Sequence, residues 1–167
     1  MLTGETGDKR TGWFDPLSGE PCDLGHITSR ILDNSSYTVH VGTDSHRAKP
    51  KDSGGKTGYV FATVICLYEP GKGADYYCRR TFREGEYGNL RHRITDEVSE
   101  SVDVSLLLME HIPSHQISVH ADINSDARHK THSYLQSVRA WIQSIGFKFL
   151  CKPNAWASTG VADKHAK

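Results

Sequence analysis

A nearly continuous apolar segment, Tyr59–Tyr68, constrains the fold of this chain more than any other feature. It is about half as long as the roughly 20 residues that a membrane-spanning helix needs, so we expect burial inside a folded domain and no membrane association. The turn-forming sequence 69–73 and a second strand-like segment, 74–82, follow it. Together they predict a β-hairpin whose first strand is covered on both faces of a sheet.

The remaining patterns predict a mixed sheet of five strands with flanking helices. Alternating and β-branched segments predict further strands, and apolar residues at helical spacing predict helices. The strands are expected at 37–43, 116–121 and 147–152, and the helices at 24–32, 90–111, 130–145 and 158–167. Three strands precede the first long helix, which favours an antiparallel meander, and the later alternation of strand and helix favours parallel additions.

The first 22 residues differ from the rest of the chain. They are rich in glycine and show little periodicity, so we expect residues 1–22 to be an extended or poorly ordered leader and residues 23–167 to be the domain. Asp23 is a candidate N-cap for the helix at 24–32, and Gly146 is a candidate C-cap for the helix that it follows. Trp13 and Phe14 of the leader pack either on the domain or on a partner.

Charge and cysteine content narrow the cellular setting. Lys plus Arg and Asp plus Glu each number 20, so a nucleic-acid partner would have to be attracted by a local basic patch. The four cysteines form no Cys-x-x-Cys pair, and the N-terminus has no apolar signal-peptide core. We therefore expect reduced thiols in a cytoplasmic protein, without a disulfide framework.

Four acidic residues fall at positions where a sheet and its covering helices meet. Asp44 follows the predicted strand 37–43 and Asp122 follows the strand 116–121, so both side chains reach one crevice if the two strands are neighbours. Glu97 and Asp163 would approach from covering helices. Each residue alone is as easily a turn former, a cap or a solvated surface acid. Jointly they predict a site for Mg²⁺ or Mn²⁺, since these hard cations prefer oxygen ligands.

Four sequence segments carry a resemblance to a known family. They resemble motifs of the bacterial YkuK-type RNase H-like family over residues 23–167, and they are Val41-Gly42-Thr43-Asp44-Ser45, Arg93-Ile94-x-x-Glu97, His120-Ala121-Asp122-Ile123, and Lys152-Pro153-Asn154-Ala155 through Val161-Ala162-Asp163-Lys164. The resemblance implies an RNase H-like fold with Asp44, Asp122 and Asp163 at the acidic positions. Glu97 completes the set, with Asp96 and Glu100 as rivals. His46 stands where such proteins often carry Gln, and Asn124-Ser125-Asp126 replaces a more Gly-like turn. The family name implies an architecture more than a reaction.

These residues lead to a functional hypothesis. We expect a metal-dependent nuclease in which Asp44, Glu97, Asp122 and Asp163 are catalytic and hold two divalent ions that hydrolyse phosphodiester bonds. The substrate class stays open among RNA, DNA and their hybrid, and a branched junction would favour a homodimer. The alternative is a non-catalytic RNase H-like domain that binds nucleic acid or a protein.

Two further groups of residues accompany the acids. We expect the first group to orient the carboxylates by hydrogen bonding, with ordinary core or surface positions as the alternative; it comprises His40, Ser45, His120 and His165. We expect the second group to contact nucleic acid, with a charged hairpin edge as the alternative for its β-strand members; it comprises Arg79, Arg80, Arg83, Arg91, Arg93 and Lys152.

Overall fold

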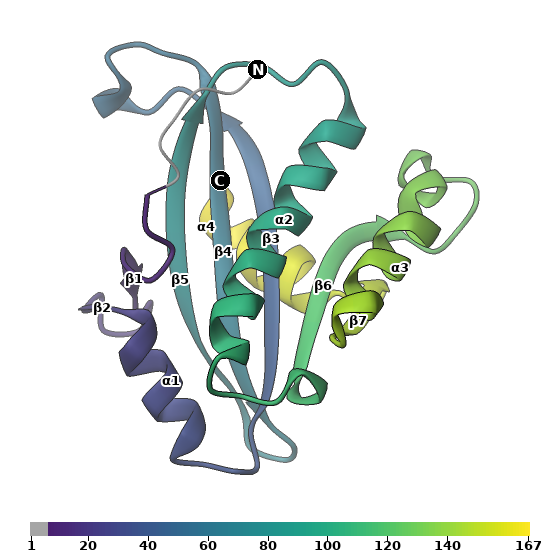
Figure 1. Ribbon diagram of the computed structural model, residues 1–167. Helices are drawn as coiled ribbons and strands as arrows, with labels where there is room; N and C mark the ends of the chain where they lie inside the picture. The colour runs from purple at the N-terminus through teal and green to yellow at the C-terminus, as the bar shows by residue number, and fades with distance from the viewer. Residues whose placement is uncertain (1–6) are drawn as a thin grey trace.

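A computed structural model describes residues 7–167, and Figure 1 shows a mixed sheet with helices on both faces. The strands lie in the order β2-β1-β5-β4-β3-β6-β7. The elements are β1 Trp13–Phe14, β2 Pro21–Cys22, α1 Leu24–Leu32, β3 Thr38–Ala48, the 3-10 helix η1 Lys51–Ser53, β4 Gly58–Glu69, β5 Gly73–Glu84, α2 Leu90–Met109, the 3-10 helix η2 Ser114–Gln116, β6 Ile117–Asn124, the 3-10 helix η3 Lys130–Tyr134, α3 Leu135–Ile145, β7 Lys148–Lys152, the π-helical turn η4 Ala157–Ala162 and α4 Asp163–Ala166. No helix within residues 7–167 is long and apolar enough to cross a membrane.

The mixed α/β class predicted from the sequence is confirmed, but the predicted number of strands is wrong. The sheet has seven strands, because two short ones come from the leader. Trp13 of β1 pairs with Arg79 of β5 in antiparallel register, and the Trp13 side chain is only 1% exposed. A strand of two residues is too short to produce an alternating pattern, so periodicity could not reveal it.

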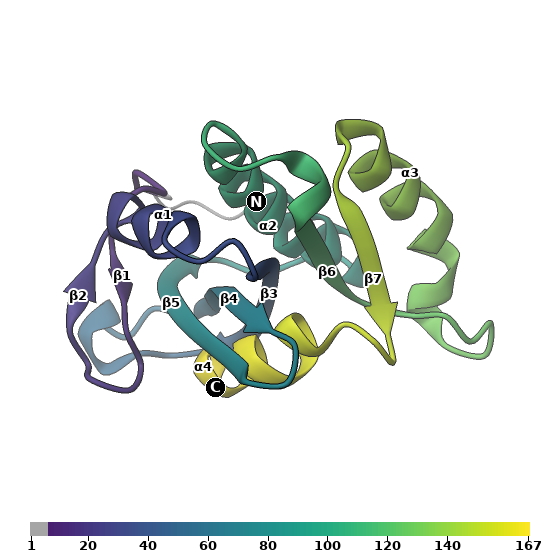
Figure 2. The ribbon, with the colours of Figure 1, turned by 90° about the horizontal axis from the view of Figure 1, so that it is seen from below.

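The sheet separates two layers of helices (Figure 2). α1, α2 and α3 cover one face, and their apolar residues share the larger core with the sheet. The C-terminal segment, η4 followed by α4, covers the other face with small residues such as Ala157 and Ala162. Both predicted caps are present: the Asp23 carboxylate accepts a hydrogen bond from the His26 amide at 2.8 Å, and Gly146 ends α3 with φ 102°.

β3 is longer than its sequence pattern suggests. It pairs with β4 continuously from Thr38 opposite Tyr68 to Ala48 opposite Gly58. The strand therefore continues through Asp44 to Ala48, beyond the predicted end at residue 43. The apolar partner strand β4 is long enough to provide this backbone pairing, which the polar sequence after Asp44 does not itself indicate. Asp44 consequently lies inside a strand, opposite Ala62.

Candidate functional site

The site lies where β3 and β6 stop pairing with each other. Their parallel register ends at Gly42 opposite His120, and Asp44 and Asp122 each lie two residues further along, on the same side of the sheet. A β-bulge in the β6–β7 pairing adds to this divergence. His120 pairs with Leu150 and Asn124 with Lys152, so four residue steps on β6 face two on β7, with Asp122 in the middle. Bulges commonly redirect a side chain next to an active site.

A glycine on β3 allows the third acidic residue to reach the site. A Cβ atom at Gly42 would lie 2.6 Å from the Ser158 backbone nitrogen, closer than atoms tolerate, so only glycine lets η4 rest against β3. η4 leads directly into α4, whose first residue is Asp163. The Asp163 and Asp44 carboxyl groups lie close enough to interact, which raises the pKa of Asp44 and lowers that of Asp163. Two neighbouring carboxyl groups repel each other when both are ionised, so such a pair tends to share a proton.

Glu97 approaches from the opposite layer. It lies on α2, is 5% exposed, and accepts a hydrogen bond of 2.6 Å from the Ser45 hydroxyl. Ser45 follows Asp44 in β3 and faces α2, because successive side chains of a strand point to opposite faces. The Ser45 hydroxyl thus holds one carboxylate of the acidic set. A role of Ser45 in catalysis stays a prediction. Arg93 Nε lies 3.6 Å from the same Glu97 oxygen.

Burial and mutual repulsion make the acidic set costly to ionise. Burial raises the pKa of Asp44 to about 7, with further contributions from Asp122 and Asp163. Burial likewise raises the pKa of Glu97 to about 8, against the lowering effect of the Ser45 hydrogen bond. The pKa of Asp163 is lowered, chiefly by Lys167, whose Nζ lies 2.7 Å from Asp163 Oδ2. The set is therefore rich in oxygen ligands and short of positive charge.

The donor chemistry fits a divalent cation, although the ligands do not surround one point. Among residues 7–167, no group of three or more His, Cys, Asp or Glu side chains is arranged to hold a metal ion. Asp122 Oδ1 is buried without a hydrogen bond, and its nearest cation is Lys152 Nζ at 2.5 Å, outside hydrogen-bonding geometry. A buried carboxylate oxygen held by one lysine, beside acids that repel one another, offers oxygen ligands of the kind that Mg²⁺ or Mn²⁺ prefers.

The two rivals of Glu97 are occupied elsewhere. Asp96 accepts a hydrogen bond of 2.6 Å from the Tyr87 hydroxyl. Glu100 forms an ion pair with Arg83 and lies 3.2 Å from Lys9 Nζ. Glu97 is the residue of these three whose pKa Asp44 and Asp122 raise.

The histidines form a hydrogen-bonded chain that supports the C-terminal segment. His40 Nδ1 lies 2.9 Å from His120 Nε2, and His120 Nδ1 accepts a hydrogen bond of 3.0 Å from the Ala157 amide. Burial lowers the pKa of His40 to about 4 and that of His120 to about 3, so both are neutral at pH 7. Their hydrogen-bond partners are each other, Thr38 and the start of η4, and not a carboxylate. They act on Asp163 only by holding η4. His165 pairs with the Tyr76 hydroxyl at 3.0 Å.

The predicted nucleic-acid contacts divide into three groups. Arg79 is 6% exposed and lies 3.9 Å from Glu100, and Arg83 stacks over Phe61 and pairs with Glu100. We assign these two to holding β5 against α2. Arg80 and Arg91 are exposed. The two remaining residues, Arg93 and Lys152, line a cavity beside the acidic set.

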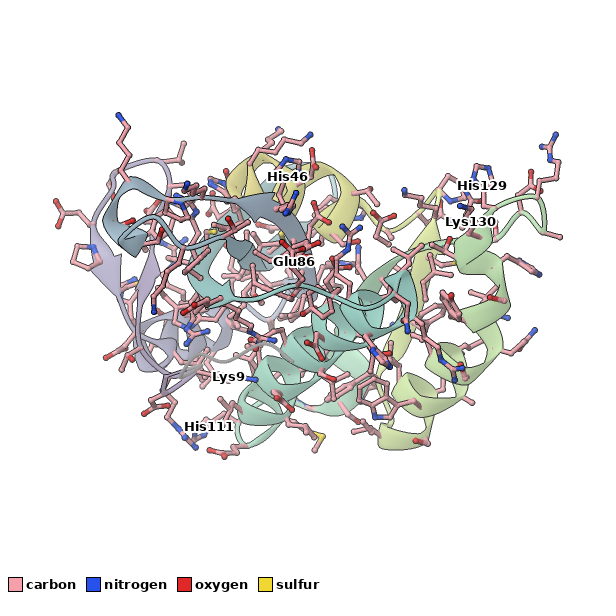
Figure 3. The ribbon with its side chains drawn as sticks, turned by 90° about the horizontal axis from the view of Figure 1, so that it is seen from above. Lys9, His46, Glu86, His111, His129 and Lys130 are labelled. Carbon is pink, nitrogen blue, oxygen red and sulfur yellow. The ribbon has the colours of Figure 1, made fainter. Side chains whose placement is uncertain are left out.

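This cavity of about 330 Å³ brings residues from four elements to the acids. Glu97 and Asp122 form part of its lining, together with Leu90, Arg93, Ile94, Asn124, His129, Lys130, Thr131 and Lys152. Figure 3 shows His129 and Lys130 close together and well to one side of His46, which lies by the yellow C-terminal helix. Sequence reasoning missed His129 and Lys130; their only signal is that they follow Asp122 within eight residues. Two larger cavities lie near α1, but no member of the acidic set lines them.

Fold and site together place the protein among α/β proteins with acidic side chains at diverging strand ends. The chain belongs to the Ribonuclease H-like family, whose model matches residues 25–167. This confirms the resemblance drawn from the four motifs. Searches of curated proteins and of solved structures found no match.

Proposed function

We propose that the protein hydrolyses phosphodiester bonds of nucleic acid in a reaction that depends on Mg²⁺ or Mn²⁺. The observation that carries this proposal is the pairing of Asp44 with Asp163 beside Asp122 and Glu97, four acids with too little positive charge between them. Membership of the Ribonuclease H-like family supports a nucleic-acid substrate.

In this proposal Asp44, Asp122 and Asp163 hold the metal ions, with Glu97 completing the set. Divalent ions held there would supply the activation of a water and the stabilisation of the departing 3′ oxygen, and the products would carry a 5′-phosphate and a 3′-hydroxyl. The protein supplies the rest. Ser45 fixes the Glu97 carboxylate, and Gly42 admits the segment that carries Asp163. The cations of the cavity bind phosphate oxygens of the substrate strand.

A non-catalytic binding domain is the second candidate, and one observation favours it. Lys152 and Lys167 already pair with Asp122 and Asp163, at 2.5 Å and 2.7 Å. A site neutralised in this way by its own lysines can bind nucleic acid through the cavity without turnover. The two candidates differ in whether added metal leads to cleavage.

Cleavage of a labelled panel separates them. The panel holds single-stranded RNA and DNA, both duplexes, an RNA–DNA hybrid and a four-way junction, each with Mn²⁺, Mg²⁺ or chelator. Asp44→Asn should reduce the cleavage rate by on the order of a thousandfold or more, because it removes the acid that contacts two others. Asp52→Asn, an exposed acid on η1, is the matched control and should cleave normally. Full activity in folded Asp44→Asn would rule out the proposed mechanism.

A further inference from the structure

Lys152 lies between the acidic set and the cavity beside it. Its Nζ lies 2.5 Å from Asp122 Oδ1, and its side chain also lines the cavity that holds Arg93 and Lys130. Both partners are partly open to solvent, with 41% of the Lys152 side chain and 29% of the Asp122 side chain exposed. The ammonium is therefore at the boundary between the acidic set and the phosphate-sized space beside it.

We propose that Lys152 is an exchangeable counter-ion of Asp122, which a divalent cation displaces into the cavity, where its ammonium binds a phosphate of the nucleic acid. This inference rests on the proposed function for the identity of the metal and of the substrate. It adds a role that links the two binding events through one side chain.

The geometry of the contact favours exchange. Asp122 Oδ1 has no hydrogen bond from another residue, so its one local counter-charge is the Lys152 ammonium. A lysine ammonium is a compact charge on a flexible four-carbon chain, which turns at little cost when its partner is taken. The bulge sets the distance, since Lys152 is opposite Asn124 and Asp122 lies in the extra backbone between Asn124 and His120.

Lys130 provides a matched comparison within the same cavity. It lines the same space as Lys152 and is exposed, but within the described part of the chain no salt bridge is found for it. Both lysines can therefore contact a phosphate, whereas Lys152 alone of the two also neutralises a metal-binding carboxylate. Removing each charge in turn separates the two effects.

Exchange of one ammonium between two partners requires reciprocal coupling. Metal binding frees Lys152 for the phosphate, and phosphate binding withdraws it from Asp122, so each ligand raises the affinity for the other by the same factor. Without metal, Lys152 stays on Asp122 and contributes little to binding of the nucleic acid. Lys152 should therefore contribute to binding of the nucleic acid only with metal, whereas Lys130 should contribute with and without it.

The first readout is the affinity for Mn²⁺ alone, measured by calorimetry on the full chain without nucleic acid. Lys152→Met should bind Mn²⁺ roughly fivefold more tightly than wild type, the size expected for releasing a partly exposed ion pair. Lys130→Met should stay within about twofold of wild type. Lys152→Arg keeps the charge and should stay near the wild-type affinity, which shows that charge and not packing is responsible.

The second readout is binding of a labelled single strand, with Ca²⁺ or with chelator, checking that the strand stays intact. Lys152→Met should bind roughly fivefold more weakly than wild type with Ca²⁺ but equally with chelator. Lys130→Met should bind more weakly under both conditions. Unchanged or weaker Mn²⁺ affinity in folded Lys152→Met would overturn the exchange. A wild-type protein that binds no Mn²⁺ at all would overturn the metal centre of the proposed function as well, so the two failures are distinguishable.

Discussion

Two buried carboxylates on α2, three residues apart, behave in opposite ways. Glu100 is 1% exposed and is surrounded by cations: it pairs with Arg83, and Lys9 Nζ and Arg79 Nη1 lie 3.2 Å and 3.9 Å from its oxygens. Glu97 is 5% exposed and has only Ser45 and the more distant Arg93 nearby, with further acids beyond. The protein surrounds one buried carboxylate with cations and leaves the other largely without counter-charge.

The difference separates a structural from a functional use of the same residue type. The Glu100 cluster joins the leader, β5 and α2, since Lys9, Arg83 and Glu100 come from these three parts of the chain. Removing one member would leave a buried charge unpaired, which is costly. At Glu97 the folded protein already bears the cost of a buried carboxylate without a full counter-charge. Such costly groups are often found at functional sites.

Substitution of Glu100 gives the strongest test of the difference between the two glutamates. Glu100→Gln should lower the free energy of unfolding by about 3–5 kcal/mol, because Arg83 and Arg79 would remain buried without their counter-charge. Urea denaturation at pH 8 without metal measures the change. Glu97→Gln is the matched control and should alter the free energy by less than about 1 kcal/mol, since it removes a charge that the fold does not compensate. Equal losses in the two variants would show that the two carboxylates are not different in kind.

The sequence predicted most of the fold because its patterns are local. The helix at 24–32 and the strands around Tyr59–Tyr68 follow from spacing and from capping residues, and the structure places them at or near the expected residues. The parallel addition of β6 beside β3 follows from the order of elements. The two-residue strands of the leader could not be predicted, since they depend on the exposed edge of β5 and on the burial of Trp13.

The candidate site was predictable in part, for a related physical reason. Asp44 and Asp122 stand out because an acid next to an apolar strand needs a partner. The choice between Glu97 and Glu100 depends on where Arg83 of β5 lies, which no helical periodicity encodes. The burial of Arg79 and the contact of Lys152 with Asp122 likewise depend on register and on a bulge. Tertiary neighbours, and not residue types, decide which charges are compensated.

The approach of η4 to β3 offers a second, smaller test of the uncompensated site. Gly42→Ala should destabilise the protein by about 2–3 kcal/mol and lower metal affinity, because the added Cβ would meet the Ser158 backbone nitrogen and push Asp163 away from Asp44. Gly160→Ala on η4 is the control, since no atom lies within 4 Å of its added Cβ. Urea denaturation and Mn²⁺ calorimetry measure both effects. Normal metal affinity in Gly42→Ala would mean that Asp163 does not depend on this close approach.

The smallest expected effect is the pH dependence of the stability of the wild-type protein, which tests whether the acidic set lacks counter-charge. The pKa of Asp44 is raised to about 7 and that of Glu97 to about 8, so between pH 6.5 and 8.5 the folded protein holds protons that the unfolded chain has released. Stability must therefore fall as pH rises through this window, by about 1–2 kcal/mol once the partial exposure of Asp44 is allowed for. His40 and His120 have a lowered pKa and reduce the stability of the protein only on the acid side, below about pH 6.5, so they do not contribute here.

Glu97→Gln should remove most of the slope, because the protein then has one less carboxylate to ionise. Saturating Mn²⁺ should flatten the slope in the wild type, since a bound cation favours the ionised carboxylates. Urea denaturation across the window measures this, and a stability that rises with pH would show that the acidic set is compensated within the protein after all.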